Sequence, residues 1–246
     1  MLKKTKDTLE LIMNDDFFVK YDFRFVGGTA LSHIINHRLS EDLDFASLEI
    51  PVKEIESMMN SYGAKKLEHD VTMEDYVTND GEDIDNSYMK FILNGVKVEF
   101  FTPPFNLFEI SVWEKDKYNY YENSSLKIAS LNTIIYMKTM AFWNRKKYRD
   151  LFDIYFVLSN NHINENDFIN NYLENNITYK IDDLYKKIQS TTQFYKRQND
   201  EGINTLVKNP KSYEWYRLEI EKYIHKVLLD KLYSWFKYRK FKKRNI

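Results

Sequence analysis

The stretch FVGGTALSHIINHRLSEDLDF, residues 25–45, constrains the fold most, because its parts favour three backbone structures in quick succession. A short β-type run, FRFV, stops at Gly27 and Gly28. Thr29 follows as a candidate N-cap for a helix whose apolar positions 31, 34 and 35 share one face. The order predicts a strand, a glycine turn and a helix.

Two aspartates follow this helix on a second predicted strand. Side chains alternate along residues 42–47, so Asp42 and Asp44 project from one face, and Leu43 and Phe45 from the other. Two carboxylates held side by side repel each other and raise each other's pKa unless a cation lies between them. Mg²⁺ prefers oxygen ligands, and two such ions can bind both a triphosphate and an attacking hydroxyl.

The glycines would supply the other half of such a site. Without Cβ atoms, Gly27 and Gly28 let backbone N–H groups approach phosphate oxygens at the positive end of the following helix. Taken alone, a D-x-D pair is usually a solvated turn and a GG pair usually a bend. Strand, glycines, helix and D-x-D in this order form a more specific combination, which indicates phosphate-transfer chemistry.

A third acid lies within a later β-type run, VKVEFF, where Glu99 stands between Val98 and Phe100. A carboxylate on the inward face of a strand is costly unless it is paired or bound to a metal. Glu99 is therefore a candidate third metal ligand. The alternative is a position on an edge strand.

Elsewhere the first half of the chain mixes helical and β-type segments. Residues 3–20 have helical spacing, and Pro51 opens a helix that ends near Gly63. Three β-type segments follow between residues 67 and 102: HDVTMEDYVT, SYMKFIL and VKVEFFT. Asn94-Gly95, between the last two, predicts a hairpin.

The second half has helical spacing throughout. Ser130 is a candidate cap for a helical segment that runs to residue 158. Further helices are predicted at 165–176, 181–198 and 212–240. The prediction is an α+β fold with two domains: an α/β core at 1–125 and a helical region at 126–246.

Composition excludes several classes of protein. A chain of 246 residues with 43% apolar and 30% charged residues is typical of a globular protein with a sizeable core. No apolar run approaches the roughly 20 residues needed to span a bilayer, and the first residues lack the apolar stretch of a secretion signal. The absence of cysteine excludes disulfides, thiolate zinc sites and cysteine nucleophiles. We expect a cytoplasmic protein without a membrane partner.

The segments GGTAL (27–31), R-x-S-x-D-L-D (38–44) and KTMAFWNRKKYRDLFDIYFVL (138–158), together with Glu99, resemble a known family. They are similar to the abortive-infection type IV toxin nucleotidyltransferases, the AbiEii/AbiGii family of the DNA polymerase β-like superfamily. Many members of that superfamily carry serine directly before the first aspartate. Here Glu41 separates Ser40 from Asp42, which agrees with the R-x-S-x-D-x-D form of the toxin family.

The resemblance implies a polymerase β-like core with a mixed sheet, followed by a helical part that covers the active-site cleft. It also implies transfer of a nucleotidyl group from an NTP with release of pyrophosphate. Such toxins are paired with an antitoxin, and some relatives modify the 3′ end of tRNA, so RNA is the expected acceptor. The alternatives are a small-molecule or protein acceptor, or a non-catalytic module that binds nucleotide or RNA.

The same resemblance assigns roles to individual residues. The expected metal ligands for two Mg²⁺ ions are Asp42, Asp44 and Glu99. The expected catalytic residues are Asp42, Asp44, Glu99 and Lys138. The expected nucleotide-binding residues are Gly27, Gly28, Thr29, Arg38, Ser40, Lys138, Arg149 and Asp150.

If residues 130–158 form one helix, Lys138, Arg145 and Arg149 fall at i, i+7 and i+11, close to one stripe. Three cations on such a stripe would neutralise charge on the leaving pyrophosphate. The alternative is a solvated basic face on which Arg149 pairs with Asp153, worth about a few tenths of a kcal/mol. In the functional interpretation, Asp150 would orient Arg149 or contact the base or the acceptor.

The C-terminal tail KLYSWFKYRKFKKRNI, residues 231–246, interleaves aromatic and basic side chains. The net charge of the chain is only −1, so any contact with nucleic acid must come from a local cluster of this kind. In one interpretation the aromatic rings stack on bases while the cations follow the phosphate backbone. In the other, the tail is the end of an amphipathic helix whose lysines face water.

Overall fold

The computed structural model describes residues 1–68, 84–103, 110–144, 147–174 and 202–244, together with single residues at 180, 183 and 186. The chain divides into two compact units, Met1–Met137 and Lys138–Ile246. The strand expected at 69–78, the helix expected at 181–198 and Arg145 lie outside the described residues.

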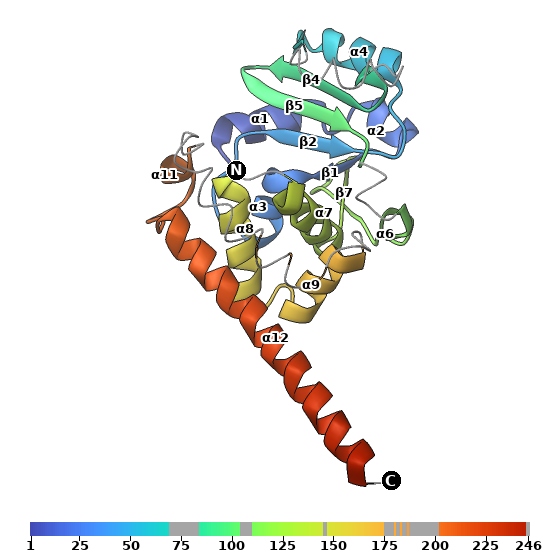
Figure 1. Cartoon of the computed structure of the whole chain (residues 1–246). Coiled ribbons are helices and arrows are strands. Elements are labelled where there is room, and N and C mark those ends of the chain that lie inside the picture. The colour runs from blue at the N-terminus through green and yellow to red at the C-terminus, as the bar shows by residue number, and fades with distance from the viewer. Residues whose placement is uncertain are drawn as a thin grey trace. The chain divides into compact units, whose positions relative to one another are not determined.

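The first unit contains a mixed sheet of seven strands in the order β3-β4-β5-β2-β1-β7-β6 (Figure 1). β2 runs parallel to β5, and β1 runs parallel to β7, while the other neighbours are antiparallel. The strands are β1 (Arg24–Val26), β2 (Leu43–Ala46), β3 (Lys65–Lys66), β4 (Tyr88–Leu93), β5 (Val96–Phe101), β6 (Asn119–Tyr120) and β7 (Lys127–Ile128). The predicted α+β fold with a mixed sheet is confirmed. The alternative of an edge strand for Glu99 is wrong, because β5 lies between β4 and β2.

Helices accompany this sheet in the first unit. They are α1 (Lys3–Ile12), α2 (Asp16–Lys20), α3 (Gly27–Ile35), α4 (Val52–Ser61), the 3₁₀ turn η1 (Ile84–Asn86), α6 (Ile110–Glu114) and the start of α7 (Leu131–Asn144). The single helix predicted for residues 3–20 is two helices. The second helix begins after Asp15, whose side chain accepts a hydrogen bond from the Phe17 backbone N–H at 2.8 Å and so caps α2. The predicted cap of α7 is confirmed, since Ser130 Oγ accepts from the Thr133 N–H at 3.3 Å.

An aromatic core covers one face of the sheet. Phe45 of β2 contacts the rings of Phe25 on β1 and Phe100 on β5, with ring centroids 5.7 and 5.3 Å away. Phe17 and Phe18 of α2 pack onto the same cluster. Since side chains alternate along a strand, turning these phenylalanines inward turns their neighbours in sequence to the opposite face of the sheet.

The predicted hairpin joins β4 to β5. Leu93 pairs with Val96, and the two turn residues, Asn94 and Gly95, both have positive φ, 51° and 67°. A two-residue turn of this kind matches the twist of the flanking strands, which is why Asn-Gly is favoured there. The hairpin fixes the register in which β4 lies beside β5.

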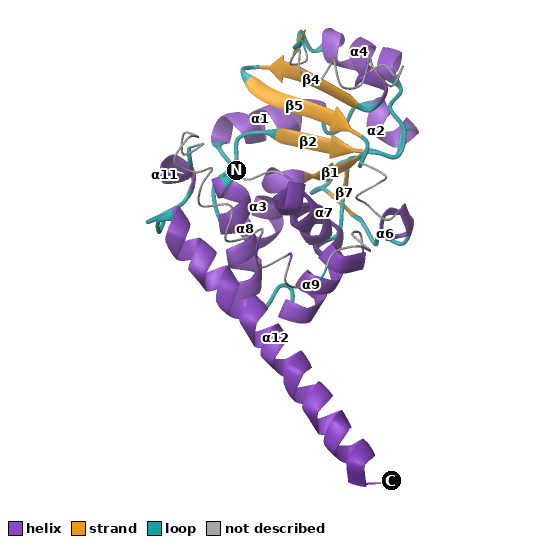
Figure 2. Ribbon diagram, in the orientation of Figure 1, coloured by secondary structure: helices purple, strands orange, loops and turns teal. Residues whose placement is uncertain are grey.

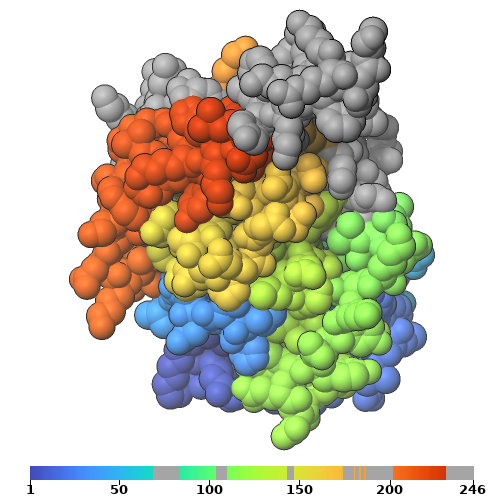
Figure 3. Space-filling view, turned by 90° about the horizontal axis from the view of Figure 1, so that it is seen from below, coloured from blue at the N-terminus to red at the C-terminus, as the bar shows by residue number. Residues whose placement is uncertain are grey.

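The described part of the second unit is helical, and its helices contrast with the strands of the first unit in Figure 2. Its elements are the end of α7, then α8 (Tyr148–Ser159), α9 (Glu165–Glu174), α11 (Ile203–Leu206) and α12 (Tyr213–Arg244). α12 packs against α8 through aromatic side chains, and the ring centroids of Tyr148 and Tyr213 lie 5.3 Å apart. In the space-filling view, the atoms of these two helices adjoin (Figure 3).

The single helix predicted from residue 130 to 158 is wrong. α7 ends at Asn144, and Lys147 has an extended backbone, with φ −94° and ψ 139°, immediately before α8 begins. The helices predicted near 165–176 and 212–240 are confirmed as α9 and α12. Among the helices of the described ranges, none is long and apolar enough to cross a membrane.

Candidate active site

The strand register brings two of the predicted acids together. Asp44 on β2 and Glu99 on β5 are direct neighbours in the parallel pairing, and their carboxyl groups are in hydrogen-bonding contact. Asp42 lies two residues before Asp44, just ahead of β2. All three side chains belong to the face opposite the aromatic core, and all three keep partial exposure to solvent. The structure therefore gathers the three carboxylates on one side of the central strands.

This arrangement concentrates negative charge. Loss of hydration around the Asp44 carboxyl, together with the charges of Glu99 and Asp42, raises the pKa of Asp44 to about 7. Burial alone would raise the pKa of Glu99 as well, but the Lys97 ammonium and the hydrogen bonds from Lys97, Tyr88 and Asp44 together lower that pKa. The pKa values of the two neighbouring acids are thus shifted in opposite directions, so Asp44 takes up a proton at a higher pH than Glu99 does.

Two further side chains complete the cluster, and neither was among the predicted site residues. The Lys97 ammonium lies 2.8 Å from Glu99 Oε2 and 3.5 Å from Asp42 Oδ2. The Tyr88 hydroxyl donates a hydrogen bond to Glu99 Oε1. Lys97 stands two residues before Glu99 and so shares its face, a signal that is visible in the sequence. Tyr88 joins the cluster only through the pairing of β4 with β5.

Gly27 is required by Asp44 itself. Its φ is +72°, and a Cβ atom built on it would lie 1.9 Å from Asp44 Oδ2. The absence of a side chain therefore lets the Asp44 carboxylate approach the backbone at the start of α3. A Cβ at Gly28 would lie 2.6 Å from an Arg38 side-chain nitrogen, so this glycine makes room for the Arg38 guanidinium.

Thr29 does not cap α3, and that prediction is wrong. The helix begins at Gly27, directly after Val26, which has no capping side chain. Thr29 is fully buried within the first turn, where its hydroxyl contacts Ser40 Oγ at 2.8 Å and donates to the Asp42 carbonyl. These bonds join α3 to the segment that carries Asp42. Thr29 and Ser40 thus position the first aspartate.

The α3–β2 connection also holds Arg38 in place. Its side chain is buried beside Gly28, and its guanidinium donates to the Leu39 carbonyl at 2.9 Å. The Ser32 hydroxyl donates to the Arg38 carbonyl from within α3. Arg38 and Ser40 therefore belong to the same first-unit cluster as the glycines and Asp42.

The donor set suits a divalent cation, although its atoms are not gathered as ligands. Within the described residues, no group of three or more His, Cys, Asp or Glu side chains surrounds a common point. Carboxylate oxygens are nevertheless the ligands that Mg²⁺ prefers, and burial together with the charges of Glu99 and Asp42 raises the pKa of Asp44. The Lys97 ammonium neutralises part of the negative charge of Asp42 and Glu99. Asp42, Asp44 and Glu99 are the residues that could hold a metal here.

In the second unit, Lys138 forms a buried ionic cluster with two aspartates. Its ammonium lies 3.0 Å from Asp150 Oδ1 and 3.0 Å from Asp153 Oδ2, and only 6% of its side chain is exposed. The alternative of a solvated face is therefore wrong for Lys138. The predicted basic stripe is also wrong, because Lys138 lies on α7 whereas Arg149, which is partly exposed, lies on α8.

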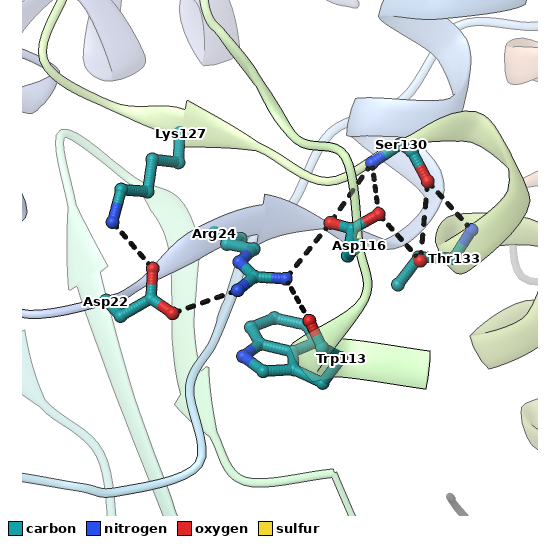
Figure 4. Close-up of polar contacts among 7 residues, drawn as sticks. All are labelled: Asp22, Arg24, Trp113, Asp116, Lys127, Ser130 and Thr133. Atoms are coloured by element: carbon teal, nitrogen blue, oxygen red, sulfur yellow. Dashed lines mark hydrogen bonds and ion pairs between the residues drawn. The ribbon is translucent and has the colours of Figure 1, made fainter. Parts of the chain in front are cut away.

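A buried arginine ties the sheet to the start of α7, as Figure 4 shows. Arg24 of β1 donates to the Trp113 carbonyl at 2.8 Å and pairs with Asp116 at 3.1 Å. Asp116 in turn accepts hydrogen bonds from the Ser130 N–H and the Thr133 hydroxyl. This network supports β1, which pairs directly with β2. It was not predicted, because its members are far apart in the sequence.

Comparisons with known proteins show what this chain is similar to. A family profile described as "Nucleotidyl transferase AbiEii toxin, Type IV TA system" matches residues 11–216. A crystal structure of a protein assigned as a nucleotidyltransferase, from H. pylori, is similar in fold, with a TM-score of 0.53 and 19% sequence identity. The similarity covers 94% of this chain and 99% of that one. No curated protein matches the chain.

Proposed function

We propose that this chain, which belongs to the AbiEii family of nucleotidyltransferase toxins from type IV toxin–antitoxin systems, transfers a nucleotidyl group from an NTP to RNA. The proposed acceptor is the 3′ end of tRNA, and the proposed cofactor is Mg²⁺. The observation that carries the proposal is the cluster of three carboxylates on adjoining strands, beside a glycine turn that opens a helix. Family membership also implies an antitoxin partner and a nucleotide substrate.

Asp42, Asp44 and Glu99 are proposed to hold two Mg²⁺ ions. When bound, the ions would supply charge neutralisation at the phosphates and lower the pKa of the acceptor hydroxyl. Asp42 and Asp44 would hold the ions, and Glu99 would help to bind the ion that activates the acceptor hydroxyl. Thr29 supports this role by donating to the Asp42 carbonyl, and Ser40 Oγ contacts the same Thr29 hydroxyl.

The first turn of α3 is proposed to bind the triphosphate. Val26 offers no capping side chain to the first N–H groups of that helix, and Gly27 and Gly28 add no Cβ atoms beside them. Negative charge is favoured at a helix N-terminus, because the backbone dipoles point their positive ends toward it. Arg38, which contacts Gly28, would add a guanidinium to the same phosphates.

From the helical unit, Lys138 is proposed to bind the triphosphate, with Arg149 assisting. Burial of an ammonium between two carboxylates is costly and is seldom kept for stability alone. Asp150 and Asp153 would fix the ammonium in one orientation. The helical unit is further proposed to cover the cleft, as the family resemblance implies.

The test is to incubate the purified chain with Mg²⁺, total tRNA and each α-³²P-labelled NTP in turn. We expect label on tRNA with one NTP, and none with Asp44→Asn. Glu41→Gln is the matched control, because Glu41 is an exposed carboxylate in the same motif. Label on tRNA from Asp44→Asn at the wild-type rate would overturn the proposed site. Label on a protein or a small molecule in place of tRNA would overturn the proposed acceptor.

A further inference from the structure

The Lys97 side chain lies among the acids that are proposed to bind a divalent cation. Its ammonium is 2.8 Å from Glu99 and 3.5 Å from Asp42, so it bridges two of the three carboxylates. Lys97 comes from β5, which Figure 1 labels. It stands two residues before Glu99 and therefore on the same face of the strand. A single positive charge thus already lies beside the oxygens that a metal would use.

Glu99 is held from both sides. Lys97 donates to Oε2 and Tyr88 donates to Oε1, while Asp44 contacts the same carboxyl group. A divalent cation that approached Asp42 and Glu99 would meet the Lys97 charge at those oxygens. Like charges at such a distance repel each other strongly, so the ammonium and the cation cannot share the position without a cost.

We propose that Lys97 is an internal counter-ion, which holds Asp42 and Glu99 together while no divalent cation is bound and competes with the cation for them. This inference rests on the proposed function, since it concerns the same carboxylates. Lys97 is then a positioning residue that sets how tightly the site binds its cation. Its side chain is 35% exposed, so it can swing toward solvent when the cation binds.

The contrasting view is that Lys97 forms an ordinary surface ion pair. Partly exposed ion pairs contribute little, and removing one would leave cation binding unchanged. The two views differ in what the ammonium does: a counter-ion competes with the cation for the same carboxylate oxygens, whereas an ordinary surface ion pair does not. Lys90 offers a matched comparison, because it lies on β4 directly opposite Glu99. The hydrogen bonds to the Glu99 carboxylate described above come from Tyr88 and Lys97.

The experiment measures Mn²⁺ binding to the full chain by the EPR signal of free Mn²⁺. The variants are Lys97→Met, Lys97→Gln, Lys97→Arg and Lys90→Met. We expect both neutral variants at Lys97 to bind Mn²⁺ about tenfold more tightly than wild type, because a repelling unit charge is gone. Lys97→Arg keeps the charge and is expected to bind like wild type, as is Lys90→Met.

A second readout needs no cation. In EDTA, Lys97→Met is expected to unfold about 2–4 °C below wild type, since the carboxylates then repel one another without a counter-ion. Saturating Mn²⁺ should remove that difference. Lys97→Gln keeps a hydrogen-bond donor to Glu99, so it tests the role of charge even if the Met variant folds poorly.

Equal Mn²⁺ affinity for Lys97→Gln, Lys90→Met and wild type, with transfer activity intact, would overturn this inference alone. Weaker binding by Lys97→Gln would overturn it as well. If wild type bound no Mn²⁺, or if Asp44→Asn bound it equally well, the carboxylate site itself would be wrong, and the proposed function would fall with the inference.

Discussion

At the scale of single residues, Gly27 and Asp44 depend on each other. The carboxylate of Asp44 occupies the space that a side chain at Gly27 would need, with 1.9 Å between the built Cβ and Oδ2. Gly63 has nearly the same φ, +75° against +72°, but no atom lies within 4 Å of its built Cβ. The two glycines therefore separate the cost of backbone conformation from the cost of displacing Asp44.

We expect Gly63→Ala to lower the free energy of unfolding by about 1 kcal/mol, the usual cost of alanine at positive φ. Gly27→Ala should cost more and should also reduce nucleotidyl transfer at least about 100-fold, because a small misplacement of a reacting group is that costly. Urea unfolding and labelled-NTP transfer measure the two effects. Equal transfer rates for the two variants would contradict the role given to Gly27.

We also expect Asp44 to change how the free energy of unfolding depends on pH. Its pKa is raised to about 7 in the folded chain from the ordinary aspartate value of 3.8, so between those values the folded state binds more protons than the unfolded state. The Asp44 contribution to the free energy of unfolding is therefore largest near pH 4, declines up to about pH 7 and is constant above it.

Urea unfolding in EDTA at several pH values, compared between wild type and Asp44→Asn, measures what the titration of Asp44 contributes. We expect the variant to gain stability relative to wild type as pH rises from about 4 to about 7. A difference between the two proteins that stays constant with pH would contradict the raised pKa.

At the scale of elements, the break between α7 and α8 brings Lys138 to the two aspartates of α8. Because the chain turns at Lys147, the two helices place Lys138 against Asp150 and Asp153, which one continuous helix would not do. Two carboxylates, each 3.0 Å from the Lys138 ammonium, therefore hold it firmly in a buried place.

We expect Lys138→Met to lower the free energy of unfolding by about 3–5 kcal/mol, because it removes the ammonium from between two buried carboxylates. Adding Asp150→Asn and Asp153→Asn should recover most of that loss, as measured by urea unfolding. Transfer should stay abolished in the triple variant, since the proposed phosphate ligand is gone. A triple variant that regained both stability and transfer would show that Lys138 is structural only.

At the scale of the whole molecule, the chain divides into a unit with a sheet and a helical unit, and its last helix is long. Among the α12 side chains that the structure describes, which run from residue 213 to 230, the last buried one is Val227. A chain that stops at Asp230 keeps all of these buried side chains, so we expect it to keep its fold, with a free energy of unfolding within about 1 kcal/mol of the full chain.

The same truncation decides between the two interpretations of the basic tail. Affinity for tRNA is measured at two salt concentrations for both lengths of chain. If the tail follows the RNA backbone, the shorter chain binds more weakly and shows a smaller dependence on salt, because fewer counterions are released. If the tail is only the end of a helix, both lengths of chain bind alike.

The sequence alone determined the features that depend on neighbouring residues. Asn94-Gly95 specified its hairpin through local φ preferences, and alternation along residues 42–47 placed Asp42 and Asp44 on one face. Its motifs also carried the resemblance to the family to which the chain belongs. Such features follow from backbone geometry over a few residues, so they can be predicted without knowing the fold.

Tertiary structure decided what lies beside those residues. The pairing of Asp44 with Glu99, the ammonium of Lys97 between two acids and the hydroxyl of Tyr88 all depend on strand register. The turn before α8 and the burial of Thr29 likewise depend on packing, which overrode the helical spacing and the capping preference. Register and packing arise from contacts between residues distant in the chain. Local periodicity contains no record of those contacts.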